Sequence, residues 1–196
     1  MTGLRRLWGL AGRVVGVAVR LCLLGVILAT PAYLFLANFA IFEPYLFPLH
    51  YLQGNVHHVT PDIIVGPYPD EGLFDNLHQR GVRVVISLLD PHLIYEKSLI
   101  EREDHLAREL GMADYDYPMN SSEPPSSPLN ARALREIRHF IERHPKTRIY
   151  IHCYLGKHRV GDVAAMLIQW LGREHKLPPG SAKPGGPGGA APPVRP

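Results

Sequence analysis

Hydrophobic residues gather first in one uninterrupted run near the N-terminus. Residues 21–42, LCLLGVILATPAYLFLANFAIF, contain no charged side chain. At about 1.5 Å per residue, a helix of this length just spans a hydrocarbon core of roughly 30 Å. A cleaved signal peptide has a shorter apolar core, and a buried core helix is rarely so free of polar groups. The pattern therefore predicts one retained transmembrane helix, preceded by a basic segment over residues 1–20.

Between residues 57 and 176 the pattern changes to short apolar runs that alternate with amphipathic stretches. The runs favour β-strands over four ranges, 62–65, 82–89, 113–119 and 148–152. The stretches favour helices over 70–80, 95–110, 129–144 and 160–171. Strands separated by helices predict an α/β domain of three layers, in which helices flank a central, mostly parallel sheet. Residues 43–56 are a linker to this domain.

The C-terminal segment, residues 177–196, has a different composition. Pro and Gly dominate it, and it contains almost no large apolar side chain. Such a segment buries too little surface to offset the entropy of ordering it. It is therefore predicted to be a disordered tail.

Basic residues lie on one side of the apolar run. Arg5, Arg6, Arg13 and Arg20 precede it, and no Lys or Arg follows until Arg80. The positive-inside rule then predicts a single-pass membrane protein with a cytoplasmic N-terminus. Residues 57–176 carry more carboxylates than basic side chains, so the domain has no electrostatic reason to bind nucleic acid.

The stretch that carries chemistry is residues 151–161, IHCYLGKHRVG, between the last predicted strand and the last predicted helix. In an α/β sheet this is the usual ligand position. The five residues between Cys153 and Arg159 can close around one tetrahedral anion, with backbone N–H groups pointing inward. Arg159 offers a planar fork for two phosphate oxygens. Gly156 and Gly161 are expected to allow close approaches that a Cβ would block.

The same surroundings favour the charged form of the cysteine. A cysteine at a helix N-terminus beside cationic groups is substantially thiolate. Attack of Cys153 on phosphorus would give a phosphocysteine, which water hydrolyses in a second step. The chain has one further cysteine, Cys22 in the apolar run, so no disulfide framework is expected.

The pattern His152-Cys153-x5-Arg159 resembles the signature of the protein tyrosine phosphatase superfamily. The form CxxGKHRxG, residues 153–161, is most similar to the plant and fungal type of atypical dual-specificity phosphatase, which also has bacterial members. The resemblance implies a phosphatase-like domain over residues 57–176 that hydrolyses phosphate monoesters without a metal or other cofactor. These phosphatases are usually cytosolic, so the side of the membrane on which the domain lies stays open.

The resemblance also assigns roles to residues. Cys153 would be the nucleophile, and His152 would help to keep it ionised. Phosphate would be bound by the loop, which consists of Tyr154, Leu155, Gly156, Lys157, His158 and Arg159. The basic pair Lys157 and His158 suits inositol or lipid phosphates as well as phosphoproteins. A membrane would be the other partner.

Two departures from the family pattern bear on activity. Val160 stands where the family has Ser or Thr, whose hydroxyl assists departure of the thiolate. The loop that should hold an aspartate acid, residues 119–125, reads MNSSEPP, so Glu123 is the candidate acid. A phosphate-binding pseudophosphatase without turnover is therefore the alternative function. A rhodanese-like sulfurtransferase also places a cysteine at a helix start, but the preceding His152 argues against it.

Several polar residues are interpreted more simply. His57 and His58 are taken as a solvated linker pair, and Asp114 and Asp116 as charges on a strand surface. The basic residues of one predicted helix are taken as a solvated face, namely Arg132, Arg135, Arg138 and Arg143. His152, Cys153 and His158 lie within seven residues without a second cluster, which is a poor pattern for zinc.

Overall fold

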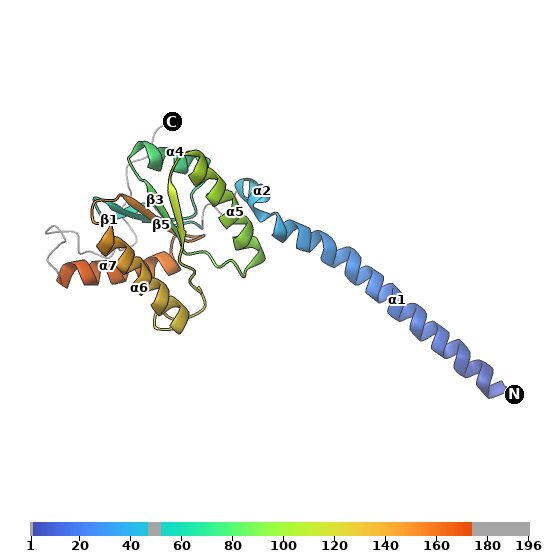
Figure 1. The fold of residues 1–196 in the computed structure, drawn as a ribbon. Coiled ribbons are helices and arrows are strands. Elements are labelled where there is room, and N and C mark those ends of the chain that lie inside the picture. Colours follow the sequence, from blue (N-terminus) through green and yellow to red (C-terminus); the bar gives the residue numbers. More distant parts are fainter. Residues whose placement is uncertain (1, 47–51, 174–196) are drawn as a thin grey trace.

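The computed structural model of the protein describes residues 2–46 and 52–173. The predicted disordered tail, residues 177–196, lies outside them. An N-terminal helix, α1 (Thr2–Ala37), projects away from the domain (Figure 1). Its segment Gly16–Ala37 has a mean hydropathy of 2.0 and no buried residue, so it is long and apolar enough to cross a membrane.

Helix α1 ends earlier than the apolar run does. Asn38 interrupts it, and a short helix, α2 (Phe39–Phe42), and a 3-10 turn, η1 (Glu43–Tyr45), follow. Both Phe39 and Glu43 are buried against the domain. The last residues of the predicted transmembrane run thus belong to the contact between α1 and the domain.

A five-stranded sheet forms the centre of the domain, with strand order β1-β2-β5-β3-β4. Its strands are β1 (His57–Thr60), β2 (Ile63–Gly66), β3 (Val84–Ser87), β4 (Ala113–Asp116) and β5 (Ile149–His152). β1 pairs antiparallel with β2, and the other neighbours are parallel. The mostly parallel sheet that the sequence predicts is therefore confirmed.

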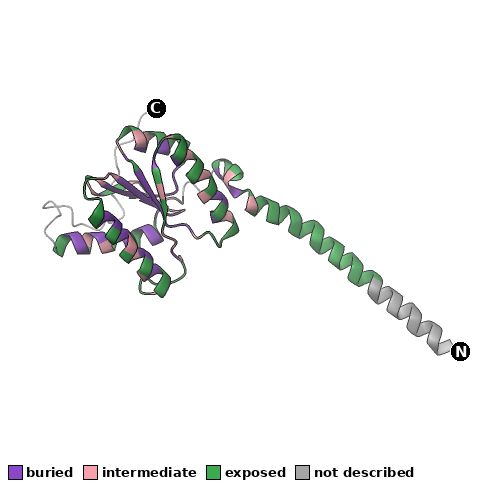
Figure 2. Cartoon of the chain, in the orientation of Figure 1, coloured by how far each residue is buried: buried purple, intermediate pink, exposed green. Residues whose placement is uncertain are grey.

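Helices cover both faces of this sheet. The helices are α4 (Glu71–Gln79), α5 (Ile94–Glu109), α6 (Pro128–Arg143) and α7 (His158–Arg173). Side chains of α6 and α7 pack with Ile86 and Ile151 on one face. Side chains of α4 and α5 pack with Val85 and Tyr150 on the other. Because neighbouring strand residues point to opposite faces, these alternating side chains build two core layers. Figure 2 shows the buried sheet between the half-buried helices.

One strand was not predicted. His57 and His58 are exposed, as expected of a linker pair, but they begin β1. The segment HHVT carries little strand signal of its own. It is extended because its backbone pairs with the apolar strand β2, and Val59 enters the core.

Candidate active site

The parallel strands end together at one edge of the sheet. Gly66, His152, Ser87 and Asp116 are the last residues of β2, β5, β3 and β4, and they pair in this register. Cys153 follows β5 directly, and α7 begins five residues later at His158. Cys153 therefore lies at the carboxyl edge of the sheet, as the sequence predicts.

The loop after Cys153 turns its carbonyl groups outward. The carbonyl of Tyr154 accepts a hydrogen bond from the N–H of Tyr68 (3.2 Å), and that of Leu155 accepts one from the N–H of Gly54 (2.7 Å). With these carbonyls bound on the outer side, the N–H groups of the loop are left to face an anion. This is the arrangement of a backbone anion site.

Glycine is required at one of the two predicted positions. Gly156 has φ of +66°, and a Cβ there would lie 2.4 Å from the backbone nitrogen of Pro67. Both facts exclude a side chain. A Cβ at Gly161 would meet nothing within 4 Å, and its φ is ordinary. The expectation that Gly161 allows a close approach is therefore wrong.

Arg159 lies on the first turn of α7 and is held by a carboxylate from α5. Its two terminal nitrogens contact the two oxygens of Glu96 at 2.6 and 2.9 Å, and Nη1 also donates to the carbonyl of Leu88 at 2.9 Å. Burial lowers the pKa of Arg159, but the hydrogen bond and charge of Glu96 outweigh it and raise the pKa. These contacts use three of the five N–H groups of a guanidinium. The Nε–H and one N–H of Nη2 are left for a phosphate.

A small cavity of about 120 Å³ opens above the loop. It is lined by Cys153, Tyr154, Leu155, His158 and Arg159 from the predicted loop, and by Tyr95, Glu96 and Ser121 from elsewhere in the chain. Gly156 is buried and Lys157 is exposed, and neither lines it. A larger cavity of about 630 Å³ lies between α4 and α5 and includes no residue of the loop. The small cavity is the one that can hold a phosphate against Cys153.

The loop that holds the candidate acid is pinned by one buried amide. Asn130 donates to the carbonyls of Asn120, Glu123 and Pro124, and its Oδ1 accepts from the N–H of Asn120 at 2.8 Å. Ser121 of this loop lines the cavity, whereas the exposed side chain of Glu123 accepts from Asn120 at 3.1 Å. The loop thus borders the site, and the role of Glu123 stays a prediction.

His152 points away from the phosphate loop into a buried acidic cluster. Its Nε2 lies 2.5 Å from Oε1 of Glu103, and both side chains are fully buried. Ser87 donates to the other oxygen of Glu103 at 3.2 Å. Burial raises the pKa of Glu103 well above its usual range, and burial lowers the pKa of His152 to about 4. Whether the shared proton lies on the carboxyl or on the ring, the pair has no net charge. His152 therefore adds no net positive charge beside Cys153.

Asp114 belongs to the same cluster. Its Oδ1 is buried without a hydrogen-bond partner in the described part of the chain, and burial, then the nearby Glu103, raises its pKa to about 8. Asp114 is therefore half-buried, and one of its oxygens is not solvated as the strand-surface interpretation expects. Asp116, two residues further along the edge strand, is exposed as expected.

Replacing Asp114 with asparagine should flatten the pH dependence of stability. The folded state holds this proton more tightly than the unfolded chain, because the pKa rises from 3.8 to about 8. The protonated carboxyl therefore stabilises the folded state fully at pH values below 3.8, the pKa in the unfolded chain. This stabilisation is lost as the pH rises through about 8, the pKa in the folded protein. We expect the melting temperature of Asp114→Asn, relative to the unchanged protein, to rise steadily from pH 4 to pH 8. Thermal unfolding in detergent measures it, and the exposed Asp75→Asn is the control. A constant difference across this range would contradict the shift.

Two further expectations concern Val160 and the arginines of α6. Val160 is 1% exposed and packs in the hydrophobic core next to Cys153. On the surface of α6, Arg132 pairs with Glu136 at 2.8 Å, and Arg138 pairs with Glu142 at 2.9 Å. The predicted solvated face is confirmed for these two. Arg138 also lies over the ring of Trp170 at 5.2 Å.

The layers, the cysteine loop and the buried arginine together define a cysteine-dependent phosphatase of the protein tyrosine and dual-specificity type. The chain belongs to the family described as the DSP-PTPase phosphatase of polymorphic toxin systems, whose model matches residues 68–173. This confirms the resemblance that the loop motif indicates.

Solved structures agree with this fold. A protein described as a phosphatase of DUF442 from Shewanella putrefaciens CN-32 matches with a TM-score of 0.50 and 22% identity, over 63% of this chain and 74% of that one. The Siw14 catalytic core matches with a TM-score of 0.50 and 18% identity, over 61% and 68%. A structure of Siw14 from S. cerevisiae, a PP-IP phosphatase, with citrate gives 0.48 and 22%, over 62% and 68%. No curated protein sequence matched the chain.

Proposed function

We propose that this protein hydrolyses phosphate monoesters through a phosphocysteine formed on Cys153. The observation that carries the proposal is the cavity above the loop, which both Cys153 and Arg159 line. Because His152 brings no net charge, the thiolate is stabilised mainly by the loop N–H groups and the first turn of α7.

The two half-reactions balance without a metal or another cofactor. In the first, Sγ of Cys153 forms a bond to phosphorus as the ester P–O bond breaks, and Glu123 gives its proton to the leaving oxygen. In the second, water attacks phosphorus and returns a proton to Glu123. The P–S bond breaks with its electron pair returning to Sγ, and inorganic phosphate leaves. Arg159 and the loop N–H groups bind the transferring oxygens in both steps.

The proposed substrates are phosphoproteins or inositol and lipid phosphates. Lys157 and His158 support this range, because both are exposed beside the cavity and add positive charge for a multiply phosphorylated ligand. The apolar segment Gly16–Ala37 supports a single-pass membrane anchor. We propose that this segment is retained and that its N-terminus is cytoplasmic.

Hydrolysis of p-nitrophenyl phosphate by the detergent-solubilised full chain tests the proposal. Turnover that vanadate inhibits is the expected result. Vanadate binding without turnover would instead indicate a pseudophosphatase. Sulfur transfer from thiosulfate to cyanide without phosphatase activity would indicate a sulfurtransferase.

Replacing Glu123 with glutamine should slow hydrolysis by an amount that depends on how readily the leaving group departs as an anion. A general acid contributes about 10²- to 10⁴-fold when the leaving oxygen needs its proton. We therefore expect about a 100-fold loss of kcat/KM on an alkyl phosphate and little loss on p-nitrophenyl phosphate, whose leaving group is stable as an anion. Steady-state kinetics on both substrates measure the difference. Glu101→Gln, on the exposed face of α5, is the matched control. Equal losses on both substrates would remove Glu123 as the acid.

Replacing Val160 with threonine should speed the second half-reaction. A hydroxyl beside Cys153 would donate a charge-assisted hydrogen bond to the departing thiolate, of order 1.5–3 kcal/mol. That corresponds to roughly ten- to a hundredfold in rate. The unchanged protein should show a burst of product followed by slow turnover, and Val160→Thr should turn over faster with a smaller burst.

Rapid-quench kinetics measure both quantities. Val160 is buried in the core, so a thermal unfolding scan must accompany the kinetics. A stable Val160→Thr protein with unchanged turnover, and no burst in either form, would show that this position does not limit the enzyme.

A further inference from the structure

The segment that follows α1 packs against two residues of the active-site wall. Phe39, on α2, is 7% exposed. Its ring centroid lies 5.8 Å from that of Tyr95 and 5.9 Å from that of Tyr154, both in edge-to-face geometry. Tyr95 and Tyr154 line the cavity that contains Cys153. Phe39 therefore links the segment after α1 directly to two residues that line the cavity.

Polar contacts fix this segment to the domain. The N–H of Ala40 donates to Oγ of Ser98 at 3.1 Å, and Arg102 donates to the carbonyl of Ala40 at 3.3 Å. Arg102 also lies 3.8 Å from the buried carboxylate of Glu43. Ser98 and Arg102 are on α5, the helix whose first turn carries Tyr95 and Glu96. The anchor and the active site are thus attached to the same helix.

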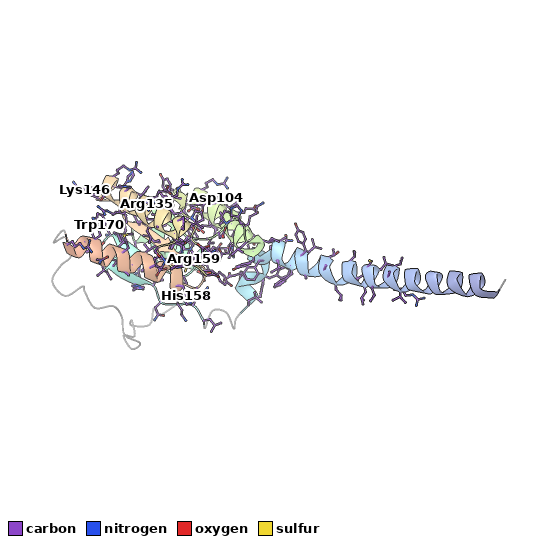
Figure 3. All side chains as sticks on the ribbon, turned by 90° about the horizontal axis from the view of Figure 1, so that it is seen from below. Asp104, Arg135, Lys146, His158, Arg159 and Trp170 are labelled. Atoms are coloured by element: carbon purple, nitrogen blue, oxygen red, sulfur yellow. The ribbon has the colours of Figure 1, made fainter. Side chains whose placement is uncertain are left out.

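These contacts place the active site close to the bilayer surface. Phe39 lies two residues beyond Ala37, where the membrane-spanning segment ends. At about 1.5 Å per residue, its backbone is within a few ångströms of the hydrocarbon boundary. Figure 3 agrees, because His158 and Arg159 lie nearer to α1 than Lys146 and Trp170 do. With Gly16–Ala37 as the proposed membrane span, the wall made by Tyr95 and Tyr154 would lie at the level of the lipid headgroups.

Several apolar side chains are exposed near the end of α1, and two of them, Ile41 and Tyr45, border the ion pair of Arg102 and Glu71. Ile41, Phe42 and Tyr45 follow the anchor and are 64%, 41% and 82% exposed. Leu93 and Ile94, at the start of α5, are 39% and 44% exposed. In water such a cluster next to a bare apolar helix would be unfavourable. A bilayer interface accommodates these side chains, tyrosine in particular. The ring of Phe42 lies 5.0 Å from that of Phe35 on α1, so the bilayer around α1 is the partner that covers this surface.

We propose that the substrate is a phosphate monoester carried on a membrane lipid, taken from the leaflet that the domain contacts. This inference rests on the proposed phosphatase activity. A lipid phosphate already lies at the level of the cavity, and Lys157 and His158 attract its anionic headgroup. A phosphoprotein in solution must instead bring its phosphate to within headgroup distance of the bilayer, where the membrane restricts its approach.

The experiment uses the full chain reconstituted into phosphatidylcholine vesicles. Phosphate release is compared for phosphatidic acid and a phosphatidylinositol monophosphate in the vesicles, for glycerol phosphate and inositol bisphosphate in solution, and for a phosphotyrosine peptide. Hydrolysis of p-nitrophenyl phosphate, a soluble substrate, measures the phosphatase activity that does not depend on the membrane. Because binding in the bilayer raises the effective concentration, we expect at least one lipid to exceed its soluble headgroup by about 100-fold in kcat/KM.

A matched pair of variants tests the geometry. Ile41→Asp places a charge on the proposed membrane-facing cluster, and Leu129→Asp places one on α6, where Leu129 is 40% exposed. Losing the burial of one isoleucine corresponds to about a tenfold change. The ratio of lipid to p-nitrophenyl phosphate turnover should fall by about tenfold in Ile41→Asp and stay unchanged in Leu129→Asp.

The outcomes separate the two proposals. Hydrolysis of p-nitrophenyl phosphate with the phosphopeptide preferred over every lipid would overturn the lipid substrate and leave the phosphatase. Equal rates on lipids and on their soluble headgroups would also overturn the lipid substrate and leave the phosphatase activity. An equal fall of the ratio in both variants would overturn the membrane-facing cluster. Absence of turnover on every substrate would overturn the phosphatase activity itself, and the lipid substrate with it.

Discussion

Replacing Cys153 with serine should abolish turnover of p-nitrophenyl phosphate while vanadate binding persists. A serine hydroxyl is not ionised near neutral pH, and the histidine that precedes this position, His152, contacts Glu103. Loss of a nucleophile costs on the order of 10⁴-fold or more in rate. The loop N–H groups and Arg159 are unchanged, so we expect vanadate to bind within a few-fold of its original affinity.

The second cysteine provides a control. Cys22 lies in the apolar segment of α1, far along the chain from the site, and Cys22→Ser should retain full activity. Phosphate release and vanadate titration measure both variants. Turnover that persists in Cys153→Ser would exclude the phosphocysteine mechanism.

Replacing Arg159 with lysine should lower kcat/KM by about 10²- to 10³-fold. Lysine keeps the positive charge, but its ammonium cannot hold both oxygens of Glu96 and the carbonyl of Leu88 while it also donates to a phosphate. Breaking a buried ion pair of this kind costs about 3–5 kcal/mol, which is divided between stability and catalysis. We expect KM to rise and kcat to fall together, and a lower melting temperature.

Glu96 should act through Arg159, as a positioning residue. Glu96→Gln keeps the shape of the side chain but removes the charge, so we expect a loss of about tenfold in kcat/KM. In a double variant with Arg159→Lys this loss should largely disappear, because the partner is already disrupted. Arg138→Lys, on the exposed face of α6, is the control. Additive effects of the two substitutions would show that Glu96 does not act through Arg159.

The sequence determines the phosphate loop almost by itself. Cys153, Gly156 and Arg159 lie within seven residues between a strand and a helix, so their geometry follows from local backbone structure. The alternation of apolar runs and amphipathic stretches likewise determines the three layers, because each element must bury one face. These features depend on neighbours in the chain, and the structure confirms the layers and the placement of the loop.

The tertiary structure alone decides which groups surround that loop. Glu96 is 63 residues from Arg159, and Glu103 is 49 residues from His152. In the sequence both are ordinary charged residues of an amphipathic helix, and nothing in their spacing indicates burial. They become partners because α5 packs on one face of the sheet and brings Glu103 to the ends of β3 and β5 and Glu96 to the start of α7. Phe39 is a similar case, since it reads as the last part of a membrane span and is packed against Tyr95 and Tyr154. Contacts between distant segments depend on how whole elements pack, and no local pattern records them.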